Sequence, residues 1–520
     1  MKKAGYFFFI VLAIVSLFIN LGLPPLYHEE PRRALVALEM LFSGNYITPT
    51  VAGELYYAKP PIFNWILILS YKLFGSFSEF AVRFPSVLSL LLIGAFHFLF
   101  VQRFIDRKMA FYSSMFFITC GNIYFYFSLL GEIDIFYSLL TYLCIISIFY
   151  FYQSGRFLSL FLSSFFLGAL GFLTKGFPSI VFLYVSLVVF LASEKKLKKL
   201  FSLYHLIGIT VFALISGTFF YFYSLQNPLE PYLQFLWSES SGRTVLSNPL
   251  GAFLKHLIEY PIETLRALLP YSILLVFTFR REFIKEALSV PVLRFSLLIF
   301  ISNYLVYLVS PGSNQRYIYM LFPFIILVLC YSYFRYRKTD TLRKNVIDTI
   351  ARVSLIAVAI GSFVLPFLKI SSMVPHVLFV SACLFIVSLA TVTVSLKQKD
   401  ATLSVLLFTV IMLRLAFDVV YLPIQASKGY SVEVKRNSER IVEMTSNENL
   451  YFYGDGMLFS DITGYIFYIE RGRSETLRRA QTLQGGNYYI AKEDFQESAD
   501  AEKLFSFRSR NHTYGLFKFR

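Results

Sequence analysis

The chain has 520 residues, of which 56% are hydrophobic and only 15% are charged. Soluble globular proteins carry about a quarter charged residues, so the composition excludes an ordinary soluble domain and favours a membrane protein. The net charge is +16, but the basic residues form short clusters between apolar runs. This pattern is typical of the positive-inside rule, whereas nucleic-acid binding needs a basic face on a soluble domain. We therefore expect membrane lipids as partners, no nucleic acid, and a monomer.

Long apolar runs follow one another through most of the chain. The first covers about Ala4 to Leu23 after Met1-Lys2-Lys3, and no small-residue cleavage site follows it, so we interpret it as a retained helix. At about twenty apolar residues per crossing, the sequence predicts about thirteen transmembrane helices. The others lie near residues 81–101, 109–128, 135–152, 157–173, 177–193, 203–224, 262–279, 292–309, 317–334, 346–367, 374–396 and 401–421.

Charge in the connections predicts the topology. Alternate connections carry clusters of Lys and Arg, and the positive-inside rule assigns that side to the cytoplasm, together with the N-terminus. An odd number of spans then places the C-terminus outside, in the periplasm of a bacterial inner membrane. The basic connections are residues 1–3, 103–108, 156, 195–199, 280–285, 335–344 and 397–399.

The stretch from Tyr27 to Asn64, within a predicted periplasmic loop at residues 24–64, is the most polar segment among the first spans. Within it, residues 31–42 predict a helix lying along the membrane, with Pro at its first turn and Gly44 at its end. A second short helix is predicted from Pro61. Charge at a membrane boundary is costly to desolvate, so a cluster of both signs indicates a functional site. The charged residues are Glu29, Glu30, Arg32, Arg33 and Lys59.

The composition changes after about Pro423. Residues 424–520 are polar, with alternating apolar stretches broken by glycines, which predicts a small α/β domain on the outer side. Residues 1–423 then form the transmembrane domain. No catalytic constellation stands out in the C-terminal segment. The cysteines all lie in apolar runs without a CxxC pair, so neither a disulfide nor a zinc site is indicated.

Further polar residues fall on the same predicted outer side as the first loop. A carboxylate there could accept a proton from an acceptor hydroxyl, and converging cations could hold a phosphate. Phosphate is a good leaving group, so the cations need only stabilise the charge that develops on the departing oxygen. The pattern thus suits transfer of a group from a lipid-linked phosphate. These further residues are Asp134, Lys175, Arg243, Arg316 and Tyr317.

Simpler roles compete with each of these assignments. Glu29, Glu30 and Asp134 could cap the helices that follow them. Lys59 could reach to lipid headgroups, and Arg243 fits a plain loop charge. Lys175 is a single cation between apolar spans and is expected to have a partner. His28 stands beside two glutamates, but no second histidine is near in sequence, so a divalent metal stays an unsupported alternative and no cofactor is assigned.

An ordered set of motifs resembles the GT-C glycosyltransferases, specifically the ArnT-like and protein O-mannosyltransferase-like group. The first loop carries most of the resemblance, and further matches continue in the same order as far as Pro323. The motifs are Glu29-Glu30-Pro31-Arg32, Ala37-Leu38-Glu39-Met40, Ser43-Gly44-Asn45-Tyr46, Pro49, Tyr57-Ala58-Lys59-Pro60-Pro61, Glu79 to Pro85, Ile133-Asp134, Leu170 to Gly176, and Arg316-Tyr317.

The resemblance implies a mostly α polytopic GT-C fold and an undecaprenyl-phosphate sugar donor, used in an inverting transfer. It implies Glu29 as the base, within an acidic pair with Glu30, and Asp134 as a second acid. Some members carry a metal-binding glutamate before the Lys-Pro lysine; Ala58 here argues against that metal. The acceptor is a lipid such as lipid A, another lipopolysaccharide sugar, or a protein Ser/Thr. The implied donor-phosphate contacts are Lys59, Lys175, Arg243, Arg316 and Tyr317, and we expect Arg32 of the first loop to join them.

Two other classes of membrane protein compete with the enzyme. A transporter or flippase of lipid-linked sugars predicts ionisable residues near the bilayer middle, in related halves of the chain. Here the charges gather at one face and no internal repeat is visible. A structural or sensory membrane protein leaves the ordered motifs unexplained. The sequence therefore favours a membrane glycosyltransferase.

Overall fold

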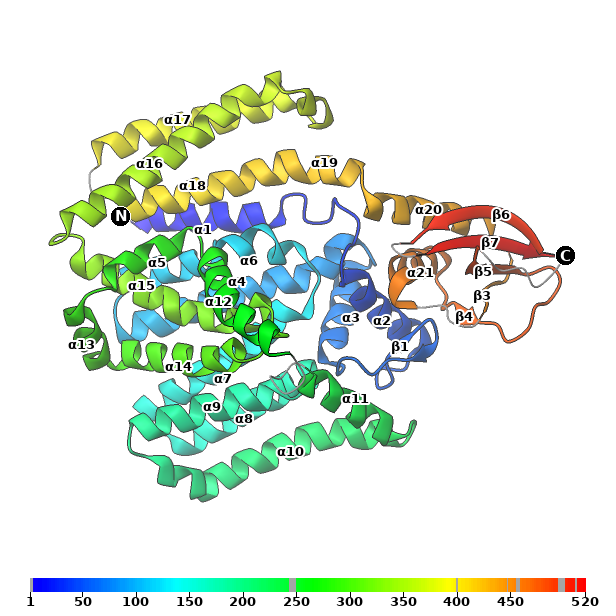
Figure 1. Ribbon diagram of the computed structural model, residues 1–520, viewed down its shortest axis with the longest axis horizontal. Helices are drawn as coiled ribbons and strands as arrows, with labels where there is room; N and C mark the ends of the chain where they lie inside the picture. The colour runs from blue at the N-terminus through cyan, green and yellow to red at the C-terminus, as the bar shows by residue number, and fades with distance from the viewer. Residues whose placement is uncertain are drawn as a thin grey trace.

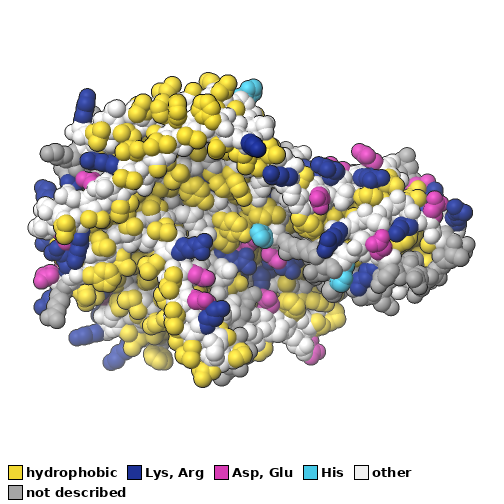
Figure 2. Space-filling view, turned by 45° about the horizontal axis from the view of Figure 1, so that its top comes forward, with side chains coloured by type: hydrophobic (Ala, Val, Ile, Leu, Met, Phe, Trp, Pro, Cys, Tyr) yellow, Lys and Arg dark blue, Asp and Glu magenta, His cyan; other side chains and the backbone are white. Residues whose placement is uncertain are grey.

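The computed structural model describes residues 3–242, 249–398, 401–446, 448–454, 459–493, 501–509 and 512–520. It consists of a large helical body and a smaller α/β part that projects from one end and carries the C-terminus (Figure 1). On the face shown in Figure 2, hydrophobic side chains cover much of the helical body, and Lys and Arg side chains lie along the edge farthest from the α/β part.

Nine helices in the described ranges are long and apolar enough to cross a membrane. They confirm the predicted mostly α, multi-pass membrane fold. Shorter apolar helices are α1 (Lys3–Phe18), α3 (Ile62–Phe74) and α9 (Pro178–Ser193). The nine spans comprise α4 (Glu79–Phe104), α7 (Ile133–Gln153), α8 (Phe157–Lys175), α10 (Leu203–Ser224), α14 (Pro291–Leu308), η5 (Gln315–Leu321) with α15 (Phe322–Tyr336), α16 (Thr341–Val364) with η6 (Leu365–Phe367), α17 (Val377–Lys397), and α18 (Thr402–Ala416) with η8 (Phe417–Tyr421) and α19 (Leu422–Ser427).

Two of the predicted spans are broken, so the expectation of unbroken helices over 109–128 and 262–279 is wrong. The first divides into α5 (Arg107–Ile118), α6 (Gly121–Phe125) and η1 (Phe127–Leu129), and the second into the end of α12 (Leu250–Ala267) and η4 (Tyr271–Phe277). The two breaks meet. The Gly121 N–H donates to the Leu269 carbonyl at 2.8 Å, and the Cys120 thiol donates to the Ala267 carbonyl at 2.9 Å. Backbone groups freed by one break are thus satisfied by the other, as the interior of a membrane protein requires.

The first loop forms α2 (Glu30–Ser43), followed by the short hairpin β1 (Thr50–Val51) and β2 (Glu54–Leu55). Pro31 stands in the first turn, and Gly44 ends the helix with a φ of 67°, which confirms the predicted helix. Most of α2 is buried against α3 and against α21 (Phe459–Arg473) of the C-terminal part. Its apolar face therefore contacts protein, where the sequence predicted a membrane surface.

The C-terminal part has the predicted small α/β architecture. Its sheet has the order β4-β3-β5-β7-β6, with β3 parallel to β4 and β5, and with antiparallel pairing of β7 to β5 and β6. Helices α20 (Tyr430–Met444) and α21 pack together beside it. The predicted boundary at residue 423 falls within α19. The strands are β3 (Leu450–Phe452), β4 (Arg478–Arg479), β5 (Tyr488–Lys492), β6 (Ala501–Arg508) and β7 (Thr513–Phe519).

Contacts from α21 and α20 hold the C-terminal part against the first loop and α4. The Leu26 N–H donates to the Tyr468 hydroxyl at 2.7 Å, and the same hydroxyl donates to Glu79 at 3.1 Å. Lys435 pairs with Glu79 at 2.8 Å. The remaining connecting helices are η2 (Leu197–Phe201), α11 (Leu229–Ser241), α13 (Arg281–Ser289) and η7 (Lys369–Met373).

Candidate active site

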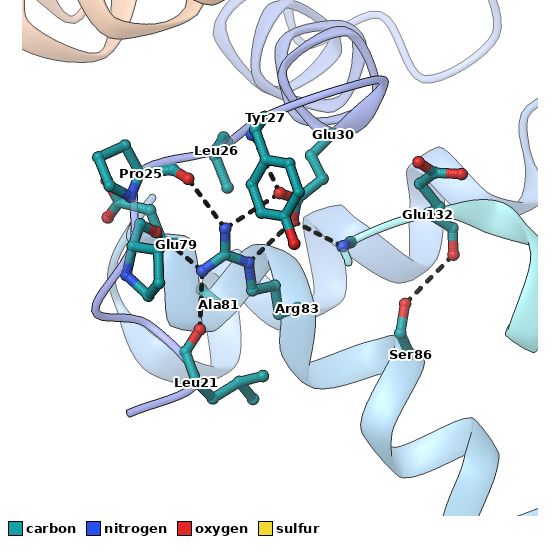
Figure 3. A network of polar contacts seen from close by, with 12 residues as sticks. Leu21, Pro25, Leu26, Tyr27, Glu30, Glu79, Ala81, Arg83, Ser86 and Glu132 are labelled. Atoms are coloured by element: carbon teal, nitrogen blue, oxygen red, sulfur yellow. Dashed lines mark hydrogen bonds and ion pairs between the residues drawn. The ribbon is translucent and has the colours of Figure 1, made fainter. Parts of the chain in front are cut away.

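Glu30 anchors the start of α2 through a buried ion pair with Arg83 of α4. The Arg83 Nε and Nη2 lie 2.9 and 3.0 Å from the two Glu30 carboxylate oxygens, and both side chains are almost fully buried. Glu30 also accepts from the Gly131 N–H at 2.7 Å and from the Tyr27 N–H at 3.1 Å. Figure 3 shows the Glu30 carboxylate pointing to the guanidinium, with the carbonyls of Leu21 and Pro25 on its other sides. Because both oxygens of Glu30 are occupied by donors within the protein, Glu30 is a structural residue, which we call the framework residue of the site.

Glu29 is positioned differently, although it is the next residue in the chain. Its side chain is 40% exposed and forms an ion pair with Arg32, one turn later. It lies on a polar cleft of about 670 Å³ that also contains Glu132 and Arg316. The segments that line the cleft include both broken spans, the start of α7 and the start of η5. The lining residues are His28, Glu29, Gly121, Asn122, Tyr126, Phe127, Glu132, Glu263, Arg266, Ala267, Leu269, Asn314, Gln315 and Arg316.

Asp134 lies at the first turn of α7 and joins two cations from distant parts of the chain. Its Oδ1 is 2.5 Å from the Nζ of Lys175 at the end of α8, and its Oδ2 is 3.7 Å from the Nε of Arg316 in η5. Arg316 also pairs with Glu132 at 2.7 Å. Asp134 and Lys175 are both buried, so this pair is little screened by solvent. The sequence prediction that Lys175 has a partner is confirmed.

A second, smaller cavity of about 190 Å³ lies on the other side of Lys175 and Tyr317. Lys59 lines it and pairs with Glu239 of α11 at 3.0 Å. The Lys175 ammonium lies 4.3 Å from the centre of the Tyr317 ring, a cation–π contact that fixes both side chains. Arg316 lines the cleft, and the next residue in the chain, Tyr317, lines this cavity.

Burial, together with the charge of the nearby Arg33, lowers the pKa of Lys59 to about 8, against the opposing effect of Glu239. Arg32 is also partly desolvated, and burial lowers the pKa of its guanidinium from the usual value. Arg32 interacts electrostatically with Glu239, which lines the cavity, and with Glu132, which lines the cleft. Cations that are partly stripped of water attract an anion strongly.

Glu132 was missed as a site residue by sequence reasoning. Its side chain is buried on the cleft, and burial together with the charge of Asp134 raises its pKa to about 7, against the opposing effect of Arg316. A carboxylate titrating near neutral pH is suited to accept a proton. The available signal was its position two residues before Asp134 at a membrane boundary, next to Gly131.

The predicted site residues other than Arg243 thus gather at one end of the helical body. They divide into a framework residue (Glu30), cleft residues (Glu29 and Arg316) and cavity residues (Lys59, Lys175 and Tyr317), with Asp134 and Arg32 between them. Arg243 lies outside the described residues. Within the described ranges, no group of three His, Cys, Asp or Glu side chains could hold a metal ion.

The sequence is similar to those of known sugar transferases over part of its length. Residues 58–221 match the family described as dolichyl-phosphate-mannose-protein mannosyltransferase. The chain is 40% identical over 104 residues to an undecaprenyl phosphate-alpha-4-amino-4-deoxy-L-arabinose arabinosyl transferase of Shewanella sediminis, and 28% identical over 253 residues to such a transferase of Proteus mirabilis. The matches span 20% and 47% of this chain, and 18% and 45% of those relatives, so less than half of either relative is covered.

The comparison with solved structures covers almost the full length of the chain. The crystal structure of ArnT from Cupriavidus metallidurans bound to undecaprenyl phosphate superposes with a TM-score of 0.74, covering 99% of this chain and 98% of that one at 16% identity. The chain therefore has an ArnT-like fold. Its C-terminal α/β part is included in the ArnT-like fold, because the superposition extends over almost the full chain. The family match covers Lys59, Asp134 and Lys175 of the candidate site, whereas Glu29 precedes it and Arg316 follows it.

Proposed function

We propose that the protein is a glycosyltransferase that transfers a sugar from a polyprenyl (undecaprenyl) phosphate to a periplasmic acceptor such as lipid A or lipopolysaccharide. The observation that carries the proposal is that Asp134 pairs both with Lys175, which lines the cavity, and with Arg316, which lines the cleft. Lys59, Lys175 and Tyr317 offer cations and a hydroxyl on one side, and Glu29 and Glu132 offer carboxylates on the other. The named relatives transfer an aminoarabinose from undecaprenyl phosphate, which supports this donor class.

The reaction requires one bond to form as another breaks. A carboxylate of the cleft, Glu29 with Glu132, takes the proton of the acceptor hydroxyl, and the acceptor oxygen attacks the anomeric carbon from the side opposite the phosphate. The bond from that carbon to the phosphate oxygen breaks, and its electron pair remains on the phosphate. Lys59 and Lys175, with Arg32 and Arg316 close by, stabilise the added negative charge. Attack from the opposite side inverts the configuration of the sugar. An acceptor phosphate already carries negative charge, so it would attack without this proton transfer.

In this proposal Asp134 orients Lys175 and Arg316 rather than taking a proton, because both of its oxygens face cations. Glu30 is assigned the positioning of α2. The N-terminus lies in the cytoplasm of a bacterial cell, the C-terminal domain of residues 424–520 lies in the periplasm, and the protein acts as a monomer in the inner membrane. The distribution of Lys and Arg along the connections supports this orientation.

The family match favours a second acceptor class, because its description names transfer of mannose to protein. One assay separates the two. Purified protein in lipid nanodiscs receives undecaprenyl phosphate carrying a radiolabelled pentose or hexose, together with an envelope extract. Label in the organic-soluble glycolipid fraction supports a lipid acceptor, and label in protease-sensitive material supports protein Ser/Thr. If the protein is folded and the label stays on the donor with every acceptor, the result contradicts the proposal that the protein is a glycosyltransferase.

A further inference from the structure

Arg33, in the first turn of α2, is a buried cation whose side chain donates a single hydrogen bond within the described part of the chain. The residue is 6% exposed, and its Nη1 donates to the Tyr56 hydroxyl at 2.7 Å. Arg83, which is 1% exposed, donates two hydrogen bonds to Glu30 and three to backbone carbonyls. A guanidinium carries several N–H donors and stays charged in proteins, so most donors of Arg33 are not used by the described residues.

The carboxylates of the site each pair with a cation other than Arg33. Arg33 interacts electrostatically with Glu132 and Asp134, but it forms no ion pair with any residue in the described ranges. The pairs are Glu29–Arg32, Glu30–Arg83, Asp134–Lys175, Glu132–Arg316 and Glu239–Lys59. Among the site residues that the structure describes, Arg33 is therefore the cation left without a counter-charge.

Arg33 lies close to the cavity that contains Lys59. Its partner Tyr56 stands three residues before Lys59, which lines this cavity together with Ala58. Arg33 also interacts electrostatically with Lys59 and Arg32. Like charges gathered in a poorly hydrated place repel one another, and burial of a cation without a counter-charge is unfavourable. An anion that binds beside Arg33 removes both effects.

We propose that Arg33, oriented by Tyr56, binds an oxyanion group of the lipid-linked sugar donor. The inference rests on the proposed function and adds to it a residue that recognises the donor. A guanidinium presents parallel N–H groups that match the paired oxygens of a phosphate or a carboxylate. Two groups of such a donor have this chemistry: its phosphate and, where the sugar is a uronic acid, the carboxylate of the sugar.

The test measures the binding of three ligands to the full-length protein in detergent by isothermal titration. The ligands are undecaprenyl phosphate, its ester with a neutral hexose, and its ester with a hexuronic acid. Arg33→Met is expected to weaken binding by about 30-fold or more, as for loss of one partner of a buried charged contact. A loss with all three ligands assigns Arg33 to the phosphate, and a loss with the hexuronic acid ester alone assigns it to the sugar carboxylate. Arg33→Lys keeps the charge without the parallel N–H groups, so a smaller loss is expected.

Thermal unfolding separates ligand binding from a structural role. In the ligand-free protein, Arg33→Met replaces an unpaired buried charge by an apolar side chain, so the Tm is expected to stay unchanged or to rise. Arg83→Met is the matched buried control, and its Tm is expected to fall because Glu30 loses its partner. Added donor is expected to raise the Tm of the wild type and of Lys72→Met, which removes an exposed cation of α3, but not that of Arg33→Met.

Two results overturn the inference and leave the proposed donor class intact. One is an Arg33→Met protein that binds all three ligands as tightly as the wild type. The other is a ligand-free Tm of Arg33→Met that falls as far as that of Arg83→Met, because Arg33 would then be a structural residue. A folded wild-type protein that binds none of the three ligands contradicts the proposed function itself, and the inference with it.

Discussion

The Nζ of Lys175 lies 2.5 Å from the Oδ1 of Asp134, and this buried ion pair joins the last residue of α8 to the first turn of α7. Because Asp134 also faces Arg316, one carboxylate fixes two cations that are far apart in the sequence. Of these cations, Arg316 lines the carboxylate-containing cleft and Lys175 lines the lysine-containing cavity.

Asp134→Asn is expected to lower both activity and stability, because it leaves the Lys175 ammonium buried without its counter-charge. Loss of one partner of a buried ion pair costs about 3–5 kcal/mol of unfolding free energy. Thermal unfolding and the transfer assay measure the two effects. Glu259→Gln removes one partner of the exposed Lys255–Glu259 pair and serves as the control, with little change expected. An Asp134→Asn protein with wild-type Tm would contradict the structural role.

Glu29→Gln and Glu30→Gln are expected to affect different properties, although the residues are adjacent: the first lowers the rate of sugar transfer and the second lowers the Tm. Glu29 is exposed on the cleft, so its substitution is expected to reduce sugar transfer about 10²- to 10⁴-fold with little change in Tm. Glu30 is buried against Arg83, so its substitution is expected to reduce the Tm strongly. Tm and the rate of sugar transfer are measured in parallel for both variants. A folded Glu29→Gln variant with a normal rate would contradict the assignment of Glu29 as the base.

The pH dependence of kcat/KM is expected to rise through about pH 7 with a hydroxyl acceptor. Glu132 must be ionised to take a proton, and its pKa in the folded protein is raised to about 7. Glu132→Gln is expected to remove the rise. Because a raised carboxyl pKa favours the protonated form in the folded state, stability from this group falls as pH increases from its ordinary range to about 7. A wild-type profile that stays flat between pH 6 and 8 argues against Glu132 as a base.

Donor affinity is expected to fall as pH rises through about 8, because Lys59 loses its proton there. Lys59→Met is expected to weaken binding of undecaprenyl phosphate about 10- to 100-fold, the contribution of a charge-assisted hydrogen bond. Lys59→Arg keeps the charge above pH 8 and is expected to remove the pH-dependent loss. Isothermal titration at pH 7 and pH 9 measures these differences. Equal affinities for Lys59→Met and wild type at pH 7 would exclude Lys59 from the phosphate site.

Gly121→Ala is expected to destabilise the protein by about 1–3 kcal/mol and to reduce activity. A Cβ at this position would lie 2.8 Å from the Leu269 carbonyl oxygen, which belongs to the backbone and has no freedom to move aside. Gly217→Ala in α10 is the matched control, because nothing lies within 4 Å of its Cβ and alanine favours a helix. If both variants unfold at the same temperature, contact between the broken spans contributes nothing to stability.

The sequence by itself determined the membrane class, the first-loop helix, the C-terminal α/β part and most of the polar residues of the site. Long apolar runs and clusters of charge are local properties of the sequence, so they can be recognised without knowing how the chain folds. Arg83 was visible as a motif residue, but its role as the partner of Glu30 depended on how α4 lies against the loop. The same holds for Glu239, which reaches Lys59 from α11.

Only the tertiary structure separates the surroundings of the two adjacent carboxylates. Glu29 and Glu30 are chemically identical, and their difference comes from burial and from the donors around each one. The two broken spans could not be distinguished from continuous helices, because an apolar run has the same composition in both forms. Their breaks are stable because the Gly121 N–H and the Leu269 carbonyl satisfy each other across the fold, and hydrogen bonds between segments about 150 residues apart leave no periodic signal in the sequence.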